Sequence, residues 1–387
     1  MLSKFNFLMN KIYLFTAAFA VMASLSGCSD TELASIDTAQ EKTPIGFHTV
    51  GSQMGSRATI INSGDITKTD FKVYAFDDAG KAFMGNNDTD ADVMAHNGVH
   101  IKYDNTTNAW TYANLSDLRY WPDSQLDFYA VSPGTVEDEE LKLFYNWKIN
   151  NVAQTITYTS FDEYGTSTHQ NLDVMYAVVK GQTKNNSGKV NLAFKHILSQ
   201  VLFKAKTNDD KLEVEIKEMK FHNAQLGGTF TIPEGNPQIE NWTINGSAKT
   251  VLTVGMDGPV KFKSAGTDVF TKPMLFVPQT LTAWTPTTET KTDADNADPK
   301  HSYLAINCRI KQNDTYLFGK DGYETLYVPF SATWKPGMRY VYTLIFGGGY
   351  TEHGQAILTP INFTASADKW NEDGGNKTPD NDINIQQ

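Results

Sequence analysis

The sequence has only two cysteines among its 387 residues, Cys28 and Cys308. Cys28 closes an apolar N-terminal stretch, whereas Cys308 stands in the alternating segment YLAINCRIK, which is typical of a strand. If Cys28 carries a modification, Cys308 has no partner for an internal disulfide. Stability must then come from packing, and we expect Cys308 to be a small, buried core residue.

The sequence also lacks the motifs of metal, cofactor and hydrolase sites. Its eight histidines form no HxH or HExxH pattern, and no GxSxG motif is present. Asp88, Asp90 and Asp92 alternate as in a calcium loop, but Val93 stands where that loop needs a glycine and Val99 where it needs an acid. We therefore expect no metal, no cofactor and no catalytic activity, and a secreted hydrolase is the least favoured class.

Positive charge is scarce as well. The chain has 33 lysines and arginines against 44 aspartates and glutamates, which gives a net charge of −11. A chain this acidic is repelled by phosphate groups, so it is a poor candidate for binding nucleic acid or an anionic lipid surface.

The first residues have the pattern of a targeting signal. Lys4 and Lys11 supply positive charge, and the apolar stretch that follows, residues 12–23, is too short to span a bilayer. The tetrapeptide LSGC that ends at Cys28 resembles the lipobox of bacterial lipoproteins. The resemblance implies a signal peptide at 1–27 and a Cys28 that carries diacylglycerol on its thiol and a further acyl chain, such as palmitate, on its freed amine. The alternative is a cysteine in an ordinary signal peptide.

The rest of the composition favours strands. Aromatic residues make up 12% of the chain, threonine is frequent, and turns rich in Gly, Asn and Asp separate the alternating runs. No long apolar stripe of helical period is present. A chain of this length exceeds one core, so we expect an all-β, sandwich-type protein of two domains. A polar tether at 28–43 precedes domains at 44–185 and 186–370, divided at the polar segment GQTKNNSGK, and a flexible tail follows at 371–387.

A short strand and a basic loop open the first domain. Ile45, Phe47 and Thr49 alternate with smaller or polar neighbours, and a glycine- and serine-rich stretch then leads to Arg57. Lys42 and Lys68 are the nearest other basic residues, so a protease with a basic specificity pocket has few local choices. The alternative is that Arg57 is an ordinary solvated arginine in a loop.

Several stretches in order resemble the fimbrillin family of Bacteroidales, the type V pilins and their fimbrillin-like relatives. These are LSGC, PIGFHT, GSRAT, FKVYAFDDAG, LDVMYAVV, VNLAFKHILSQVLFKA, MLFVPQTL and VPFSATWKPGMRYVYTLIFGGG. The resemblance implies two tandem transthyretin-like β-sandwich domains, export as a lipoprotein to the outer-membrane surface, and polymerisation into fimbriae. It also implies that an arginine-specific protease cuts between Arg57 and Ala58, which releases the first strand and opens a groove for a strand of a neighbouring subunit.

The resemblance places a candidate donor strand near the C-terminus, at Ile357, Thr359, Ile361 and Phe363. Its alternating apolar residues suit a strand that leaves its own sheet, but an ordinary closing strand of the second domain would show the same alternation. The sequence does not decide whether the chain is a shaft, tip or anchor subunit. A tip subunit would need an acceptor groove but no free donor strand.

The alternative function is a surface adhesin or glycan-binding lipoprotein that does not polymerise. Its candidate contacts are Trp110, Trp242 and Trp284, whose ring faces can stack on sugars of a host or bacterial surface if they are exposed. Tryptophans of β-sandwiches are, however, usually core residues. The expected partners are therefore other fimbrial subunits, the protease, outer-membrane lipid through Cys28, and a surface ligand in the adhesin interpretation.

Overall fold

The structure is a computed structural model. It describes residues 42–49, 66–85, 98–135, 145–160, 172–244, 250–254, 256, 258–269, 273–346, 348–350, 353, 356–358, 362–369 and 382–383. The chain divides into two units, Met1–Glu41 and Lys42–Gln387, and all of the described residues belong to the second. Cys28, Arg57 and Ala58 lie outside the described residues. Within those residues, no helix is long and apolar enough to cross a membrane.

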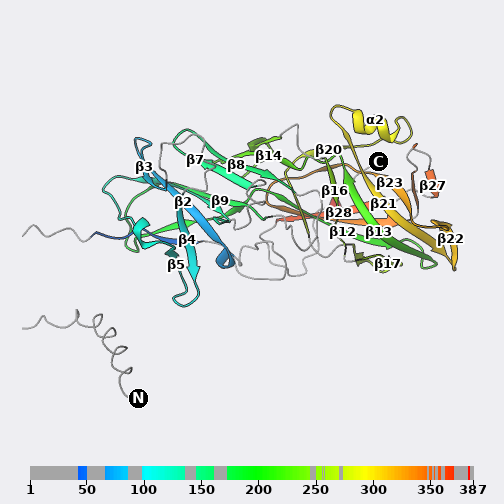
Figure 1. Ribbon diagram of the computed structural model, residues 1–387, viewed down its shortest axis with the longest axis horizontal. Coiled ribbons are helices and arrows are strands. Elements are labelled where there is room, and N and C mark those ends of the chain that lie inside the picture. Colours follow the sequence, from blue (N-terminus) through cyan, green and yellow to red (C-terminus); the bar gives the residue numbers. More distant parts are fainter. Residues whose placement is uncertain are drawn as a thin grey trace, which may run out of the picture. The chain divides into compact units, whose positions relative to one another are not determined.

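The prediction of an all-β fold is confirmed (Figure 1). Among the described residues, the helical elements are one short α-helix and three 3-10 turns: α2 (Lys291–Asn296), η1 (Ile66–Lys68), η2 (Leu115–Asp117) and η3 (Ile239–Asn241).

The first half of the chain contributes most of three sheets, which together form the first sandwich. The seven-stranded sheet has the order β11 (Lys195–His196), β9 (Met175–Gln182), β6 (Leu126–Ser132), β2 (Asp70–Asp77), β4 (Val99–Asp104) and β5 (Ala109–Tyr112), with β3 (Ala82–Met84) paired to β2. The four-stranded sheet has the order β15 (Trp242–Ile244), β14 (Gly227–Thr231), β8 (Gln154–Thr159) and β7 (Tyr145–Ile149). The two-stranded sheet consists of β1 (Gly46–Thr49) and β10 (Lys189–Leu192).

Two further sheets form the second sandwich. One has the order β18 (Thr267–Asp268), β12 (Ser199–Thr207), β25 (Met338–Phe346), β28 (Asn362–Lys369) and β29 (Asp382–Ile383), with β19 (Met274–Phe276) paired to β12. The other has the order β16 (Val251–Thr253), β13 (Leu212–His222), β21 (His301–Gln312), β23 (Glu324–Pro329), β26 (Gly348–Tyr350) and β27 (Ala356–Leu358). Off this path lie β17 (Val260–Phe262), β20 (Thr280–Ala283), β22 (Thr315–Phe318) and β24 (Ala332–Thr333).

The seven-stranded sheet is covered on both faces, which explains why its central strands are buried almost throughout. On β2, Phe71 and Val73 point into one core with β1 and β10, whereas Tyr74 and Phe76 point into a second core with the four-stranded sheet. The alternation of side chains along a strand sends neighbours to opposite faces. The sheet is thus the middle of three layers, and β1 lies on one outer side of it.

In the second sandwich, β13 has one buried face and one partly exposed face. Along β13 the buried and partly exposed residues alternate, and a bulge between Ile216 and Glu218 restores the inward pattern for Met219 and Phe221. Cys308 on β21 is fully buried in this core, as expected, and burial raises the pKa of its thiol.

The pairing of strands crosses the predicted domain division at 185/186. β10 follows that point but pairs with β1, and β14 follows it but pairs with β8. Leu275 and Val277 also belong to the core between the seven-stranded and four-stranded sheets. The division into domains at 44–185 and 186–370 stays a prediction, and the first sandwich takes elements from both ranges.

Candidate functional site

The first strand provides two large core side chains. Ile45 and Phe47 are 1% and 3% exposed, and the Phe47 ring centroid lies 6.0 Å from that of Phe71 and 6.3 Å from that of Phe128, both in edge-to-face geometry. Burial of each such side chain contributes about 1.5–3 kcal/mol. The strand is therefore part of the core of the first sandwich, as its alternation predicts.

The backbone of β1 is held along one edge by a short ladder. It pairs in parallel with β10, in the register Phe47↔Val190 and Thr49↔Leu192. At the first residue of the strand, the Gly46 amide donates to the Gly188 carbonyl at 2.9 Å. Parallel pairing is slightly weaker per residue than antiparallel pairing, so the ladder is a modest hold.

Side chains of β5 hold the other edge. The Tyr112 hydroxyl donates to the Ile45 carbonyl at 2.8 Å, and the Trp110 indole N–H donates to Thr49 Oγ1 at 3.0 Å. Burial raises the pKa of Tyr112 to about 12, against the opposing effect of Arg119, so its phenol stays protonated and donates near neutral pH. Just before the strand, the Ile45 amide donates to the Arg119 carbonyl at 2.9 Å and Pro44 forms an antiparallel bridge with Tyr120, so this edge is fixed by two side-chain bonds and a short backbone bridge.

Removal of β1 would uncover an apolar groove. Its lining consists of buried residues of the seven-stranded sheet and of β10, with partly buried aromatic residues of β5: Phe71, Ile101, Phe128, Val190, Leu192, Trp110 and Tyr112. Sequence reasoning identified β1 but missed β10 and β5 as the walls. Val190 and Leu192 alternate visibly with polar neighbours, but no local pattern shows that they pair with a strand far earlier in the chain.

The processing and anchoring residues fall in segments without described structure. Arg57 and Ala58 lie between β1 and η1, and Cys28 precedes the first described residue. Their predicted roles stay predictions.

The candidate donor segment is divided between two sheets. Ile357 is in β27 and pairs with Gly349, whereas Phe363 is in β28 and pairs with Leu344 of β25. Thr359 and Ile361 lie outside the described residues. The expectation of one continuous strand from Ile357 to Phe363 therefore needs correction, because its two ends belong to different sheets.

The tryptophans named for sugar stacking are held by the fold. Trp242 and Trp284 are 7% and 1% exposed, and each donates its indole N–H to a backbone carbonyl. Trp110 is half-buried against Phe71 and bonded to Thr49. The core interpretation therefore holds for Trp242, which lies in the core between the seven-stranded and four-stranded sheets, and for Trp284, which is buried in a small cluster with Ala294 and Tyr303.

No metal centre is found within the described ranges: no group of three or more His, Cys, Asp or Glu side chains is placed to hold an ion. Asp88, Asp90 and Asp92 lie outside those ranges. The feature that the structure does build is a strand with a buried apolar side, short pairing and a groove beneath it.

Comparisons with known proteins point to one family. A family model described as fimbrillin-like matches residues 56–370. No curated protein matches the chain. A fimbrial protein from Bacteroides vulgatus has a similar solved structure, with a TM-score of 0.55, 17% identity, and coverage of 84% of this chain and 99% of that one. The tip fimbrial protein Mfa3 from Porphyromonas gingivalis, in a C-terminally truncated form, gives a TM-score of 0.42 and 10% identity, over 78% of this chain and 94% of that one. At 17% identity, the likeness to the Bacteroides vulgatus protein concerns the fold alone.

Proposed function

The chain belongs to the fimbrillin-like family, and from this premise we propose that it is a structural subunit of a cell-surface fimbria that assembles by strand exchange. The family supports a fimbrial or adhesive role at the cell surface. Export as an outer-membrane lipoprotein through Cys28, cutting after Arg57, and replacement of β1 by a strand of another subunit are the finer parts of the proposal.

The observation that carries the proposal is the way in which β1 is held. Its apolar side chains are core residues, but its backbone ladder is short and it lies on an outer layer next to β10. A cut at Arg57–Ala58 would turn β1 into a separate peptide, which can dissociate. The exposed groove would then present unpaired backbone groups and apolar surface, and a strand from another chain satisfies both.

The pairing of β1 suggests what an incoming strand would look like. A strand that takes the place and direction of β1 would run parallel to β10 and place apolar side chains at two alternate positions, where Ile45 and Phe47 lie now. Ile361 and Phe363 meet this requirement in the C-terminal segment, whereas Ile357 is followed at the same spacing by the polar Thr359.

The acceptor role of this chain is easier to support than a donor role that uses Phe363. β28 pairs with β25 along its whole length, from Ile345↔Asn362 to Met338↔Lys369, so its removal would dismantle one sheet of the second sandwich. Within the part of the chain that the structure describes, β27 pairs with the three-residue β26 alone and could leave at a smaller cost.

The test is treatment of the purified chain with an arginine-specific protease, followed by mass spectrometry and by electrophoresis of unboiled samples. We expect loss of everything before Ala58 and the appearance of ladders that resist SDS. Arg57→Lys is the matched control, because it keeps the charge but not the specificity determinant. An intact bond after Arg57 would contradict the processing step, and clean cleavage without ladders would restrict the chain to a tip or accessory role.

A further inference from the structure

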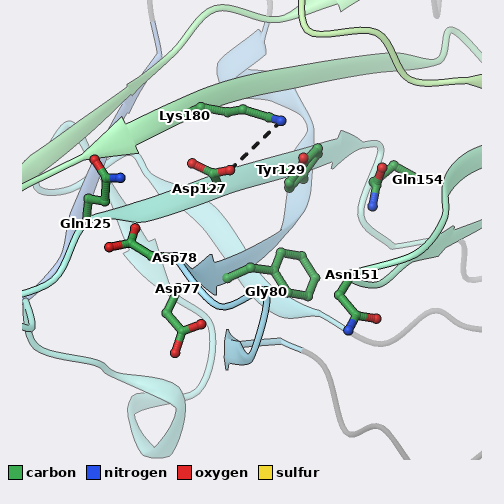
Figure 2. Close-up of a pocket in the computed structure, with 10 residues that line it drawn as sticks. Asp77, Asp78, Gly80, Gln125, Asp127, Tyr129, Asn151, Gln154 and Lys180 are labelled. Atoms are coloured by element: carbon green, nitrogen blue, oxygen red, sulfur yellow. Dashed lines mark ion pairs between the residues drawn. The ribbon is translucent and has the colours of Figure 1, made fainter.

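A polar pocket opens at one end of the cleft between the seven-stranded and four-stranded sheets. Its volume is about 400 Å³, within the range of small-molecule sites. The walls come from the end of β2 and its turn, from β6 and β9, and from the turn between β7 and β8 (Figure 2). The pocket lies on the opposite face of the seven-stranded sheet from β1, because its floor residues belong to the core shared with the four-stranded sheet.

The floor of the pocket is aromatic and buried. Phe76 and Tyr129 pack edge to face with 5.9 Å between ring centroids, and both are almost completely buried. Such rings are positioned by the core and keep their place when a ligand binds. Because little of either ring is exposed, they offer the C–H face of a ring-shaped ligand only a small apolar contact, and polar groups must supply most of the binding.

A carboxylate on β6 is oriented above this floor. Asp127 Oδ1 accepts a hydrogen bond from the Gly181 amide at 2.8 Å, and Lys180 Nζ lies 3.9 Å from Oδ2 (Figure 2). Lys180 Nζ in turn lies 2.5 Å from Glu234 Oε1, so the one cation among the described lining residues is already engaged. Asp127 is thus held through Oδ1, whereas its Oδ2 makes a long, weak ion pair with Lys180.

The rim carries further planar polar groups. Asp78 and Gln125 lie on one side of Asp127, and Asn151 and Gln154 lie at the other end of the pocket (Figure 2). Asp78, Gln125 and Asn151 are exposed. A carboxylate or a primary amide presents two polar atoms in one plane, so each can bond two neighbouring hydroxyl groups.

The lining discriminates between ligand classes. Three aspartates, Asp77, Asp78 and Asp127, face one engaged lysine, so a phosphate, sulfate or carboxylate group would be repelled. Among the described residues that line the pocket none has an aliphatic side chain, which disfavours a lipid tail. Carboxylates and amides around an aromatic floor instead match a ring that has hydroxyl groups on its edge and C–H groups on its face.

We propose that this pocket binds a terminal residue of a neutral glycan. Adhesion would then use the cleft between the two sheets, while assembly uses the opposite face of the seven-stranded sheet. A subunit inside a fimbria could hold both a donor strand and a sugar. The buried tryptophans of the cores take no part in this site.

The test is binding of the purified chain to an array of neutral, sialylated and sulfated glycans, followed by titration with the methyl glycoside of the terminal sugar of each bound glycan. We expect binding confined to neutral glycans and at least a tenfold loss with Asp127→Asn, Asp78→Ala or Gln125→Ala. Asp321→Asn changes an exposed carboxylate remote in sequence from the pocket and should bind as the parent does. Arg57→Lys should also leave binding unchanged, which separates this result from the assembly test.

The rim variants keep the test decisive if Asp127→Asn disturbs the fold, because Asp78 and Gln125 are exposed. Thermal unfolding of each variant identifies such a disturbance. Absence of binding to any glycan, binding that all pocket variants retain, a preference for anionic glycans, or binding of a lysine-rich peptide in place of a sugar would each overturn the proposal.

Discussion

His222 at the end of β13 is a polar residue in a crowded setting. Its ring stacks on that of Tyr303 with 4.6 Å between centroids, and its Nδ1 lies 3.2 Å from the Tyr303 hydroxyl oxygen. Burial lowers the pKa of His222 to about 4; the Asp295 carboxylate opposes this shift, and Lys291 and Lys220 reinforce it. The unfolded chain therefore binds a proton near pH 6.5, but the folded chain binds it only near pH 4.

This difference predicts a loss of stability in acid. Between pH 6.5 and about 4 the unfolded state is protonated at His222 and the folded state is not, so falling pH favours unfolding. With allowance for the partial exposure of the ring, we expect a loss of about 2 kcal/mol across this window. His222→Gln should lose that much less than the parent when the free energy of unfolding is measured by urea titration at pH 7.5 and 4.5.

His48→Gln, which changes an exposed histidine of β1, is the control and should follow the parent. Parallel pH profiles for the parent and His222→Gln would show that the histidine does not govern acid sensitivity.

At the scale of elements, the β1–β10 pair can be locked by design. His48 and Asn191 are register partners on neighbouring strands, and both are exposed. Adjacent strands lie about 4.8 Å apart, within the range of Cα distances that a disulfide spans. We expect His48→Cys with Asn191→Cys to form a disulfide that keeps the β1 fragment attached after the cut at Arg57.

The expected consequence is that the oxidised double variant is cut but does not polymerise until a reductant is added. Mass spectrometry without and with reductant follows the fragment, and unboiled electrophoresis follows assembly. The two single cysteine variants should polymerise in both conditions. Assembly of the oxidised double variant would show that strand exchange does not use the β1 groove.

The same elements show what local sequence can reveal. The alternation at Ile45 and Phe47 predicts a half-buried strand, and both side chains are buried. Alternation at Ile357 and Phe363 equally suggests one strand, but these residues pair in different sheets. Alternation with a period of two indicates that one face of a strand is apolar. It does not identify the strand or sheet that covers this face, because long-range packing determines it.

At the scale of the molecule, the two sandwiches share chain segments. β14 and β15 complete the four-stranded sheet, and Phe230, Trp242 and Leu275 fill its core, although all follow the polar segment that suggests a domain division. The Ser160 hydroxyl also donates to the Leu275 carbonyl at 2.9 Å. The polar composition of this segment indicates a linker between domains. It does not exclude that strands after the linker pair with strands before it.

We therefore expect a fragment of residues 44–185 not to fold alone. It would lack β10, β11, β14 and β15 and would expose the apolar faces that they cover. Circular dichroism and urea titration should show no cooperative transition for this fragment, whereas the full chain should unfold cooperatively. A monomeric fragment with a cooperative transition would instead support a domain that ends at 185.

The direction of β1 along β10 also decides how a fimbrial joint would carry tension. A donor strand that took the place and direction of β1 would run parallel to β10. If the donor is a C-terminal segment, force from its own subunit enters at its N-terminal end, while force leaves the acceptor through the chain that follows β10. The two strands are then pulled from opposite ends. Their hydrogen bonds are loaded together in shear and do not open one after another like a zip, so a joint that is short at rest can resist pulling along the fibre.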